Sequence, residues 1–359
     1  MKDTILNKPK FLILNLKKNF LPILFVFFTI CLVIFSNDNL TSAKQGLYLW
    51  ANKVVPSLFP FFIATELLGY TNIINKFEKL LNPIMKPLFN VSGSGAYAFL
   101  MGIISGYPIG AKIVTNFRKN NICTKEECER LLAFTNNSGP LFIIGTVGVS
   151  MFYNSTIGIL LFVTHLLACI TVGILFRFWK NSSVKKTANN FKQNKYLVSE
   201  KNNVTFSNLG EIISESIISA TSTILMIGGF VVLFSVILSI LDNTKLLNIF
   251  SQTINPILKV FGINNNQFSL GLTSGIVELT NGLGIITSIP YKNISTNIII
   301  SSFLLGFGGV SVLLQVFGII SKTDISIKPY IIGKILHGIF ASIYTYIFIN
   351  SFPIFNLNL

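Results

Sequence analysis

Long apolar runs separated by short polar segments recur along almost the whole chain. A run of about 20 apolar residues crosses the hydrocarbon core of a bilayer as an α-helix. Several runs are interrupted near the middle by glycine, proline and small polar residues, where a simple spanning helix would continue. The pattern predicts an all-α polytopic membrane protein in which some membrane segments are broken.

The pattern occurs twice in the chain. Residues 82–86, Asn-Pro-Ile-Met-Lys, match residues 255–259, Asn-Pro-Ile-Leu-Lys. Residues 102–106 and 271–275 each begin with Gly and end with Ser-Gly, and they are nearly as far apart along the chain as the first pair. Two matches at a similar spacing indicate an internal repeat.

Each half contains the same five predicted elements: a span, an amphipathic segment with a proline, a re-entrant hairpin, an interrupted span and a plain span. In that order they cover residues 54–70, 72–90, 93–116, 131–152 and 156–178, and then residues 212–241, 244–261, 267–290, 296–320 and 329–349. Helix-breaking residues at membrane depth are tolerated where protein or a water-filled cavity satisfies the freed backbone groups. Matched breaks in two halves therefore point to a binding site between them.

Five segments follow from this organisation. They are an N-terminal signal-anchor helix (1–45), a first repeat (46–179), a basic cytoplasmic linker (180–208), a second repeat (209–350) and a C-terminal tail (351–359). The apolar stretch in the first segment follows several lysines and lacks a small-residue cleavage site, so we expect it to be retained.

The second repeat is predicted to be inverted relative to the first. Because a re-entrant hairpin does not cross the membrane, each half crosses three times, an odd number. The segments flanking the first hairpin carry more Lys and Arg than their equivalents in the second half, and the loop joining the last two spans has the opposite bias. The positive-inside rule then places the N-terminus and the linker in the cytoplasm, and the C-terminus across the membrane.

Composition supports a membrane protein and argues against nucleic acid as a partner. The 359 residues are 51% hydrophobic and 11% charged, with a net charge of +15. The Lys and Arg mostly border apolar runs, where they act as topology signals. Four scattered cysteines suggest free thiols. We expect membrane lipid as a partner, no metal and no cofactor, and the sequence leaves a homo-oligomer open.

The hairpin tips are the first candidate site. Glycine and proline in the first tip cannot continue a helix, so backbone groups point into the space between the halves. Helix N-termini there favour an anion, and Lys112 adds a positive charge or reaches to the interface instead. The substrate-binding residues predicted at the two tips are Ser105, Gly106, Tyr107, Gly110, Lys112, Ser274, Gly275, Glu278, Thr280 and Asn281.

The interrupted spans are the second candidate. Amide and hydroxyl side chains at these breaks can bind a carboxylate or a ring nitrogen, although small residues there also suit close helix packing. The predicted binding residues are Asn136, Asn137 and Ser138 in the first half, and Ser311 and Gln315 in the second.

Ionisable groups inside the membrane deserve a separate hypothesis, because desolvation makes them costly. Glu278 either pairs with Lys112 or carries a coupling proton, and Glu66 is a weaker candidate for such a role. His165 and His337 lie at matched positions, and packing is the favoured interpretation for both. The chain has no zinc motif, nucleophile elbow or phosphate loop, so an enzyme is not predicted.

Four motifs carry a family resemblance: VPSLFPFF at 55–62, SGYPIGAK at 105–112, NNSGPLFIIGTVG at 136–148 and GGVSV at 308–312. Together they resemble the sporulation integral membrane protein YlbJ family, from about Leu47 to about Tyr346. That family is part of the nucleoside-recognition Gate-domain group, whose concentrative nucleoside transporters also use inverted repeats with re-entrant hairpins.

The resemblance implies a function in endospore formation. It suggests transport of dipicolinic acid, a planar pyridine with two carboxylates, across the outer forespore membrane, which derives from the mother cell. A small anionic substrate of this kind suits the predicted tips. Two alternatives remain: a nucleoside transporter of the same architecture, and a non-transporting membrane scaffold that recruits partners through the linker.

Overall fold

The computed structural model describes residues 8–180, 206–290 and 294–351, and within these ranges the chain forms helices and turns without a strand. Among the described residues, five helical stretches are long and apolar enough to cross a membrane: Ser36–Gly69, Ser155–Phe176, Leu209–Asn243, Ser295–Ile320 and Lys328–Ser351. The all-α polytopic prediction is confirmed.

The first half contains the five predicted elements in the predicted order. Its first span is continuous from α2 through the π-helical turn η1 to α3, and its hairpin consists of α5 and α6. The bounds are α2 Ser36–Leu49, η1 Trp50–Val54, α3 Val55–Gly69, α4 Asn72–Phe89, α5 Gly95–Ile104, α6 Ile109–Lys119, α7 Lys125–Thr135, η2 Leu141–Met151 and α8 Ser155–Phe176.

The second half repeats this order. A long span, α10, is followed by the amphipathic α11, the hairpin α12–α13, the broken span α14–α15 and the plain span α16. Their bounds are α10 Leu209–Asn243, α11 Leu246–Val260, α12 Asn266–Val277, α13 Leu279–Ser288, α14 Ser295–Phe307, α15 Gly309–Ile320 and α16 Lys328–Ser351. The predicted repeat, with two hairpins and two interrupted spans, is present.

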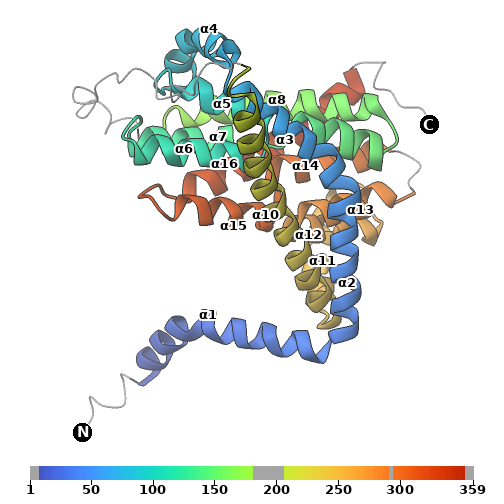
Figure 1. Ribbon diagram of the computed structural model, residues 1–359. Helices are drawn as coiled ribbons and strands as arrows, with labels where there is room; N and C mark the ends of the chain where they lie inside the picture. The colour runs from blue at the N-terminus through green and yellow to red at the C-terminus, as the bar shows by residue number, and fades with distance from the viewer. Residues whose placement is uncertain (1–7, 181–205, 291–293, 352–359) are drawn as a thin grey trace.

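The first span begins earlier than predicted. We expected a helix from residue 54, whereas the helix begins at Ser36. Residues 36–46 are mostly polar, which hides them from a search for apolar runs. They form a helix because α2 packs along α10 (Figure 1), with Gly46 so close to Ser235 that a Cβ at Gly46 would lie 2.6 Å from Ser235 Oγ.

Breaker residues end the half-helices where the sequence predicts. Gly106 has φ +74° between α5 and α6, and Gly308 has φ +84° between α14 and α15. Glycine adopts such left-handed conformations more readily than any other residue. In the first broken span, an extended stretch at 136–139 separates α7 from η2. Each break leaves helix ends inside the protein.

Two hydrophobic clusters join the halves. The first surrounds the first hairpin and includes Val114 and Leu131, but also Val316 and Tyr330 from the second half. The second surrounds the second hairpin, with Leu283 and Ile286, and includes residues of η2 and α8 from the first half. Each hairpin therefore packs on part of the opposite half's broken span, and the two halves share their cores.

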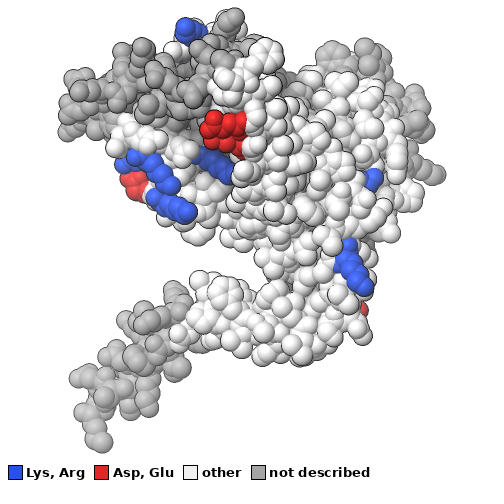
Figure 2. Space-filling view, viewed as in Figure 1, with Lys and Arg blue, Asp and Glu red and all other residues white. Residues whose placement is uncertain are grey.

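The helix α1 (Lys8–Ile34) extends away from this body (Figure 1). Its apolar residues from Phe20 to Ile34 are mostly exposed, and Cys31 packs against Val236 and Ile240 of α10. Figure 2 shows a surface on which charged side chains gather in only a few places. Exposed Ile, Leu and Phe side chains suit contact with lipid. Residues 181–205 of the predicted linker and 352–359 of the tail lie outside the described residues.

Candidate functional site

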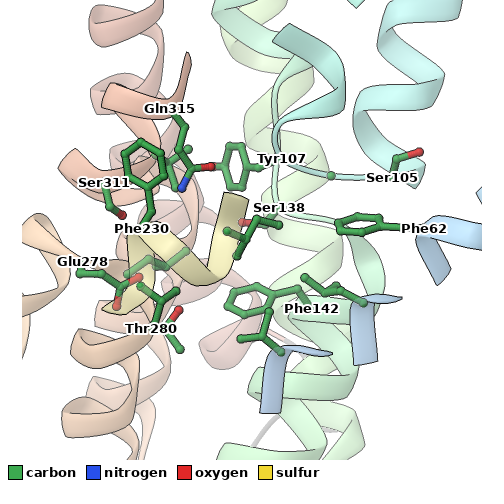
Figure 3. A pocket seen from close by; sticks show the side chains of 18 residues that line it. Phe62, Ser105, Tyr107, Ser138, Phe142, Phe230, Glu278, Thr280, Ser311 and Gln315 are labelled. Atoms are coloured by element: carbon green, nitrogen blue, oxygen red, sulfur yellow. The ribbon is translucent and has the colours of Figure 1, made fainter. Parts of the chain in front are cut away.

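A cavity of about 60 Å³ lies where both hairpin tips and both broken spans meet (Figure 3). That space holds several water molecules. Its walls come from both halves, and two spans, η1–α3 and α10, complete them. The lining residues are Val54, Leu58, Phe62, Ser105, Gly106, Tyr107, Ser138, Gly139, Phe142, Ile227, Phe230, Val231, Glu278, Leu279, Thr280, Ser311, Val312 and Gln315.

Tyr107 reaches from the first tip across to the second broken span. A Cβ built on Gly308 would lie 2.8 Å from Tyr107 Oη, so the hydroxyl rests against the backbone of the second break. In Figure 3 the hydroxyl points toward Gln315. Tyr107 is therefore a direct link between the two breaks, and its ring forms one wall of the cavity.

Glu278 forms the second tip and caps the helix that follows it. Its Oε2 accepts hydrogen bonds from the backbone N–H of Asn281 at 2.7 Å and from Asn281 Nδ2 at 3.0 Å. A carboxylate at a helix N-terminus is stabilised by the free N–H groups and by the helix dipole. This cap explains how an acidic side chain that is 3% exposed is accommodated at the cavity.

The predicted pairing of Glu278 with Lys112 is wrong. Lys112 Nζ donates to Thr223 Oγ1 at 3.0 Å on α10, on the side of Glu66, which accepts from Ser219 at 2.8 Å. The lysine follows the tip by more than one helical turn and faces α10 instead of the second tip. The acid and the base are thus held by different partners.

The amides of the first break bind protein groups. Asn136 Oδ1 accepts from the N–H of Ala111 at 3.3 Å, and Asn136 Nδ2 donates to Tyr330 Oη at 2.8 Å. Asn137 Nδ2 donates to the carbonyl of Phe134 at 2.8 Å. These bonds hold the extended stretch in place and fix the first tip against it. The next residue, Ser138, lines the cavity.

Four buried polar atoms at the cavity lack a protein partner. Ser105 Oγ, Tyr107 Oη, Ser138 Oγ and Gln315 Oε1 are buried and make no hydrogen bond within the described part of the chain. Buried polar groups are normally hydrogen-bonded, so unpaired ones at a cavity are available for water or a ligand. Three come from the first half and Gln315 from the second, which gives a bound molecule contacts on both sides.

The structure brings eight of the fifteen predicted binding residues to the cavity: Ser105, Gly106, Tyr107, Ser138, Glu278, Thr280, Ser311 and Gln315. The other seven lie outside its lining: Gly110, Lys112, Asn136, Asn137, Ser274, Gly275 and Asn281. Several of these shape the tips through the bonds described above. Binding of a substrate by any of the fifteen stays a prediction.

Sequence reasoning missed Lys334. Its side chain is fully buried in α16, and Nζ lies 3.3 Å from both the carbonyl of Asn136 and Nδ1 of His337. Nζ also lies 5.1 Å from the centre of the Tyr107 ring. The signal was present, because a lysine three residues before a histidine inside an apolar run shares a helix face with it.

Architecture and cavity define the chain as a transporter-like integral membrane protein, built from two halves around a cavity. Gate, a family described as nucleoside recognition, matches residues 51–178 and 224–325. The chain belongs to this Gate family and to that of the sporulation integral membrane protein YlbJ.

Two proteins from Bacillus subtilis (strain 168) are similar to this chain. The chain is 36% identical to YlbJ over 327 residues, which cover 89% of this chain and 80% of YlbJ. It is 25% identical to the uncharacterized membrane protein YvoD over 232 residues, which cover 64% of this chain and 68% of YvoD. The resemblance expected from the four motifs is confirmed.

Solved structures of the concentrative nucleoside transporter CNTnw have a similar fold. The inward-facing, substrate-bound state matches with a TM-score of 0.58 and 13% identity, covering 89% of this chain and 86% of CNTnw. A variant in an intermediate state matches with a TM-score of 0.60 and covers 95% and 87%. The predicted fold class, an inverted repeat with re-entrant hairpins, is thus confirmed.

Proposed function

We propose that the protein transports dipicolinic acid, or a similar small aromatic dicarboxylate, through the cavity between the hairpin tips. The observation that carries the proposal is the cavity itself, which is lined by both tips and both broken spans. In transporters built from inverted repeats, a site between broken helices becomes accessible to each side in turn as one part of the protein moves against the other.

The lining suits a flat ring. Tyr107, Phe62, Phe142 and Phe230 contribute aromatic side chains around the cavity. Aromatic faces pack favourably on planar rings. Ser105, Ser138 and Gln315 add polar groups between them, which can bind carboxylate oxygens or a ring nitrogen.

The electrostatics of the site favour a negative ligand. First-turn residues of η2, α13 and α15 line the cavity, so helix N-termini face it. The carboxylate of Glu278 is occupied by the N-terminus of α13. The buried amine of Lys334 lies behind the Tyr107 ring. Positive helix ends and a lysine near an aromatic wall suit an aromatic carboxylate better than a neutral ring.

The setting of this transport is endospore formation, because a relative that is 36% identical is named a sporulation membrane protein. On this proposal the protein resides in the outer forespore membrane, where dipicolinate made in the mother cell has to cross on its way to the spore. A reporter fusion observed in sporulating cells tests that location.

Transport is tested with purified protein in liposomes and labelled dipicolinate. We expect wild-type protein to accumulate or exchange the label. Ser105→Leu should reduce the rate at least tenfold by filling the cavity, and Gln315→Leu should do so by removing a polar group. The matched control is Leu314→Ala, since Leu314 is exposed and precedes Gln315 on the same helix. Absence of dipicolinate flux in the wild type would overturn the proposal.

The same liposomes test the alternatives. Labelled uridine or adenosine is offered in parallel, because the fold is that of a nucleoside transporter. Nucleoside flux without dipicolinate flux assigns the other substrate. If neither solute moves, and deletion of residues 181–205 abolishes the sporulation phenotype while cavity variants are silent, the protein is a scaffold.

A further inference from the structure

A cluster of three buried ionisable side chains lies behind the cavity, where the last spans of the two halves, α8 and α16, pack together. It consists of Lys334, His337 and His165, and none of these side chains is more than 3% exposed. The two imidazole rings lie 4.2 Å apart between centroids. Buried ionisable groups at membrane depth are costly and are usually functional.

The hydrogen bonds define the tautomer of His337. Its Nε2 lies 3.0 Å from the carbonyl oxygen of His165, which can only accept, so Nε2 carries the proton. In the neutral ring, Nδ1 is then an acceptor, and it faces Lys334 Nζ at 3.3 Å. Lys334 also donates to the carbonyl of Asn136. A chain of hydrogen bonds therefore links the carbonyl of Asn136 to Lys334 Nζ, Lys334 Nζ to the His337 ring, and that ring to the carbonyl of His165.

These hydrogen bonds are compatible with both the neutral and the protonated form of Lys334. A neutral amine has two N–H groups, one for Asn136 and one for His337. An ammonium has a third N–H, and the face of the Tyr107 ring, 5.1 Å from Nζ, stabilises the added charge. A proton can therefore bind or leave without breaking a hydrogen bond.

No carboxylate neutralises the cluster within the described part of the chain. The ion pairs there join Arg118 to Asp324 and Lys180 to Glu129. The ionisable groups that face Lys334 are the phenol of Tyr107 from the first tip and the thiol of Cys169 from α8, in addition to the two histidines.

The remaining neighbours add no counter-charge. On α16 itself, Tyr330 accepts from Asn136. The α14 helix, which packs along α16, carries no ionisable side chain. The buried acid of α7, Glu129, is bonded to Trp179 and Lys180. An isolated buried charge is unfavourable, so the charge on this cluster depends on what occupies the cavity next to it.

We propose that Lys334 and His337 form a proton-binding site that takes up one proton when an anion enters the cavity. The inference rests on the proposed function, whose substrate is an anion, and it specifies the coupling ion as a proton. The proton leaves a hydronium ion or a buffer acid and bonds to the lone pair on Lys334 Nζ. It returns to water when the anion departs, so that each anion moves together with a proton.

Tyr107 joins the two sites. Its ring lines the cavity on one side and lies over Lys334 on the other, while its hydroxyl rests on Gly308 of the second break. A carboxylate in the cavity thus acts on the lysine across a single ring. Any movement of the two halves that shifts Tyr107 also alters the surroundings of the proton site.

The chain offers a direct spectroscopic test, since it contains only two histidines and both belong to the cluster. Protein purified without a polyhistidine tag and labelled with ¹⁵N-histidine gives signals from these two rings alone. We expect the His337 signals to indicate a proton on Nε2, and to shift when dipicolinate is added. In weakly buffered solution at pH 7.5, we expect uptake of about one proton for each dipicolinate bound.

Two variants complete the test. Lys334→Met is expected to lose proton uptake, whereas Lys259→Met, the same change at an exposed lysine of α11, keeps it. Dipicolinate binding is measured on the same samples by equilibrium dialysis. Binding to wild-type protein with neither proton uptake nor a histidine shift overturns the inference alone. Absence of any binding overturns the proposed function instead.

Discussion

The rings of His165 and His337 lie 4.2 Å apart, although each is the counterpart of the other in the two halves. Counterparts that touch must lie close to the axis that relates the two repeats. The axis therefore passes between α8 and α16, next to the proton site and behind Tyr107. The proposed proton site therefore lies close to the axis that relates the two halves.

Gly308→Ala is expected to lower both stability and transport. Gly308 has φ +84°, and an added Cβ would lie 2.8 Å from Tyr107 Oη. Holding a non-glycine residue in that conformation costs about 1–3 kcal/mol, and Tyr107 has to move. We expect a lower thermal midpoint and at least a tenfold slower dipicolinate flux.

Gly318→Ala is the matched control for this change. Gly318 lies on the same helix, α15, and a Cβ there meets nothing within 4 Å. Alanine is a better helix former than glycine by up to about 1 kcal/mol. We expect an unchanged or higher thermal midpoint and normal flux. Equal effects of the two substitutions would show that Gly308 has no special position.

Asn136→Ala should destabilise the first break. The side chain bonds to Ala111 and Tyr330, which belong to different halves. Removing it leaves a buried N–H and a buried phenol unpaired, at a cost of about 1–3 kcal/mol. Asn52→Ala, on an exposed face of η1, serves as the control for thermal unfolding. A thermal unfolding midpoint of Asn136→Ala equal to that of the wild type would contradict the hydrogen bonds assigned to Asn136.

Two substitutions of Glu278 distinguish its role as the cap of α13 from the effect of its negative charge on transport. Glu278→Ala removes the cap of α13 and should cost about 1 kcal/mol. Glu278→Gln keeps an oxygen that accepts from Asn281, so its thermal midpoint should stay near that of the wild type while the dipicolinate flux changes. Asn265→Ala removes the cap of α12 away from the cavity, and it should lower stability with normal flux. The cavity assignment fails if Glu278→Gln leaves flux untouched and Asn265→Ala abolishes it.

The ion pair of Arg118 and Asp324 gives a pH-dependent prediction. Arg118 Nε lies 2.7 Å from Asp324 Oδ1, and its guanidinium holds the pKa of the Asp324 carboxyl below the ordinary value of 3.8. A depressed folded-state pKa adds stability that is fully present above pH 3.8 and is lost as the pH falls through the folded-state pKa. Because both side chains are partly exposed, the contribution is at most about 1 kcal/mol.

Denaturant unfolding at pH 7 and near pH 3 measures this effect. Asp324→Asn should be less stable than the wild type at pH 7, and the difference should shrink at the lower pH. Asp242→Asn is the control and should change little at either pH, because Asp242 is an exposed acid of α10 that forms no ion pair with any described residue. A difference for Asp324→Asn that grows on acidification would reverse the expected sign.

The order of the elements could be predicted from the sequence because glycine, proline and asparagine mark the breaks, and apolar runs mark the spans. The start of the first span at Ser36 could not, since α2 is polar and is stabilised by packing on α10. A sequence indicates how deep in the membrane a residue lies more readily than which neighbouring helix its side chain faces. Lys112 therefore seemed to face Glu278, whereas its helix turns it toward Thr223.

Sequence reasoning missed Lys334 for a related reason. His165 and His337 attracted attention as a matched pair, and packing was the favoured interpretation for both. Lys334 has no counterpart in the first half, so a comparison of the repeats passes over it. Only the fold reveals that α16 places this amine within hydrogen-bonding distance of His337 and next to Tyr107.

On the proposed function, a small anion passes through the cavity between the hairpin tips. Thiol modification of Gln315→Cys tests it most directly, because the four natural cysteines are buried. Ser321→Cys, at an exposed position directly after α15, is the control. We predict that dipicolinate protects Gln315→Cys but not Ser321→Cys from a water-soluble thiol reagent, and that modification of Gln315→Cys reduces flux at least tenfold. Complete modification of Gln315→Cys with unchanged flux would contradict the account.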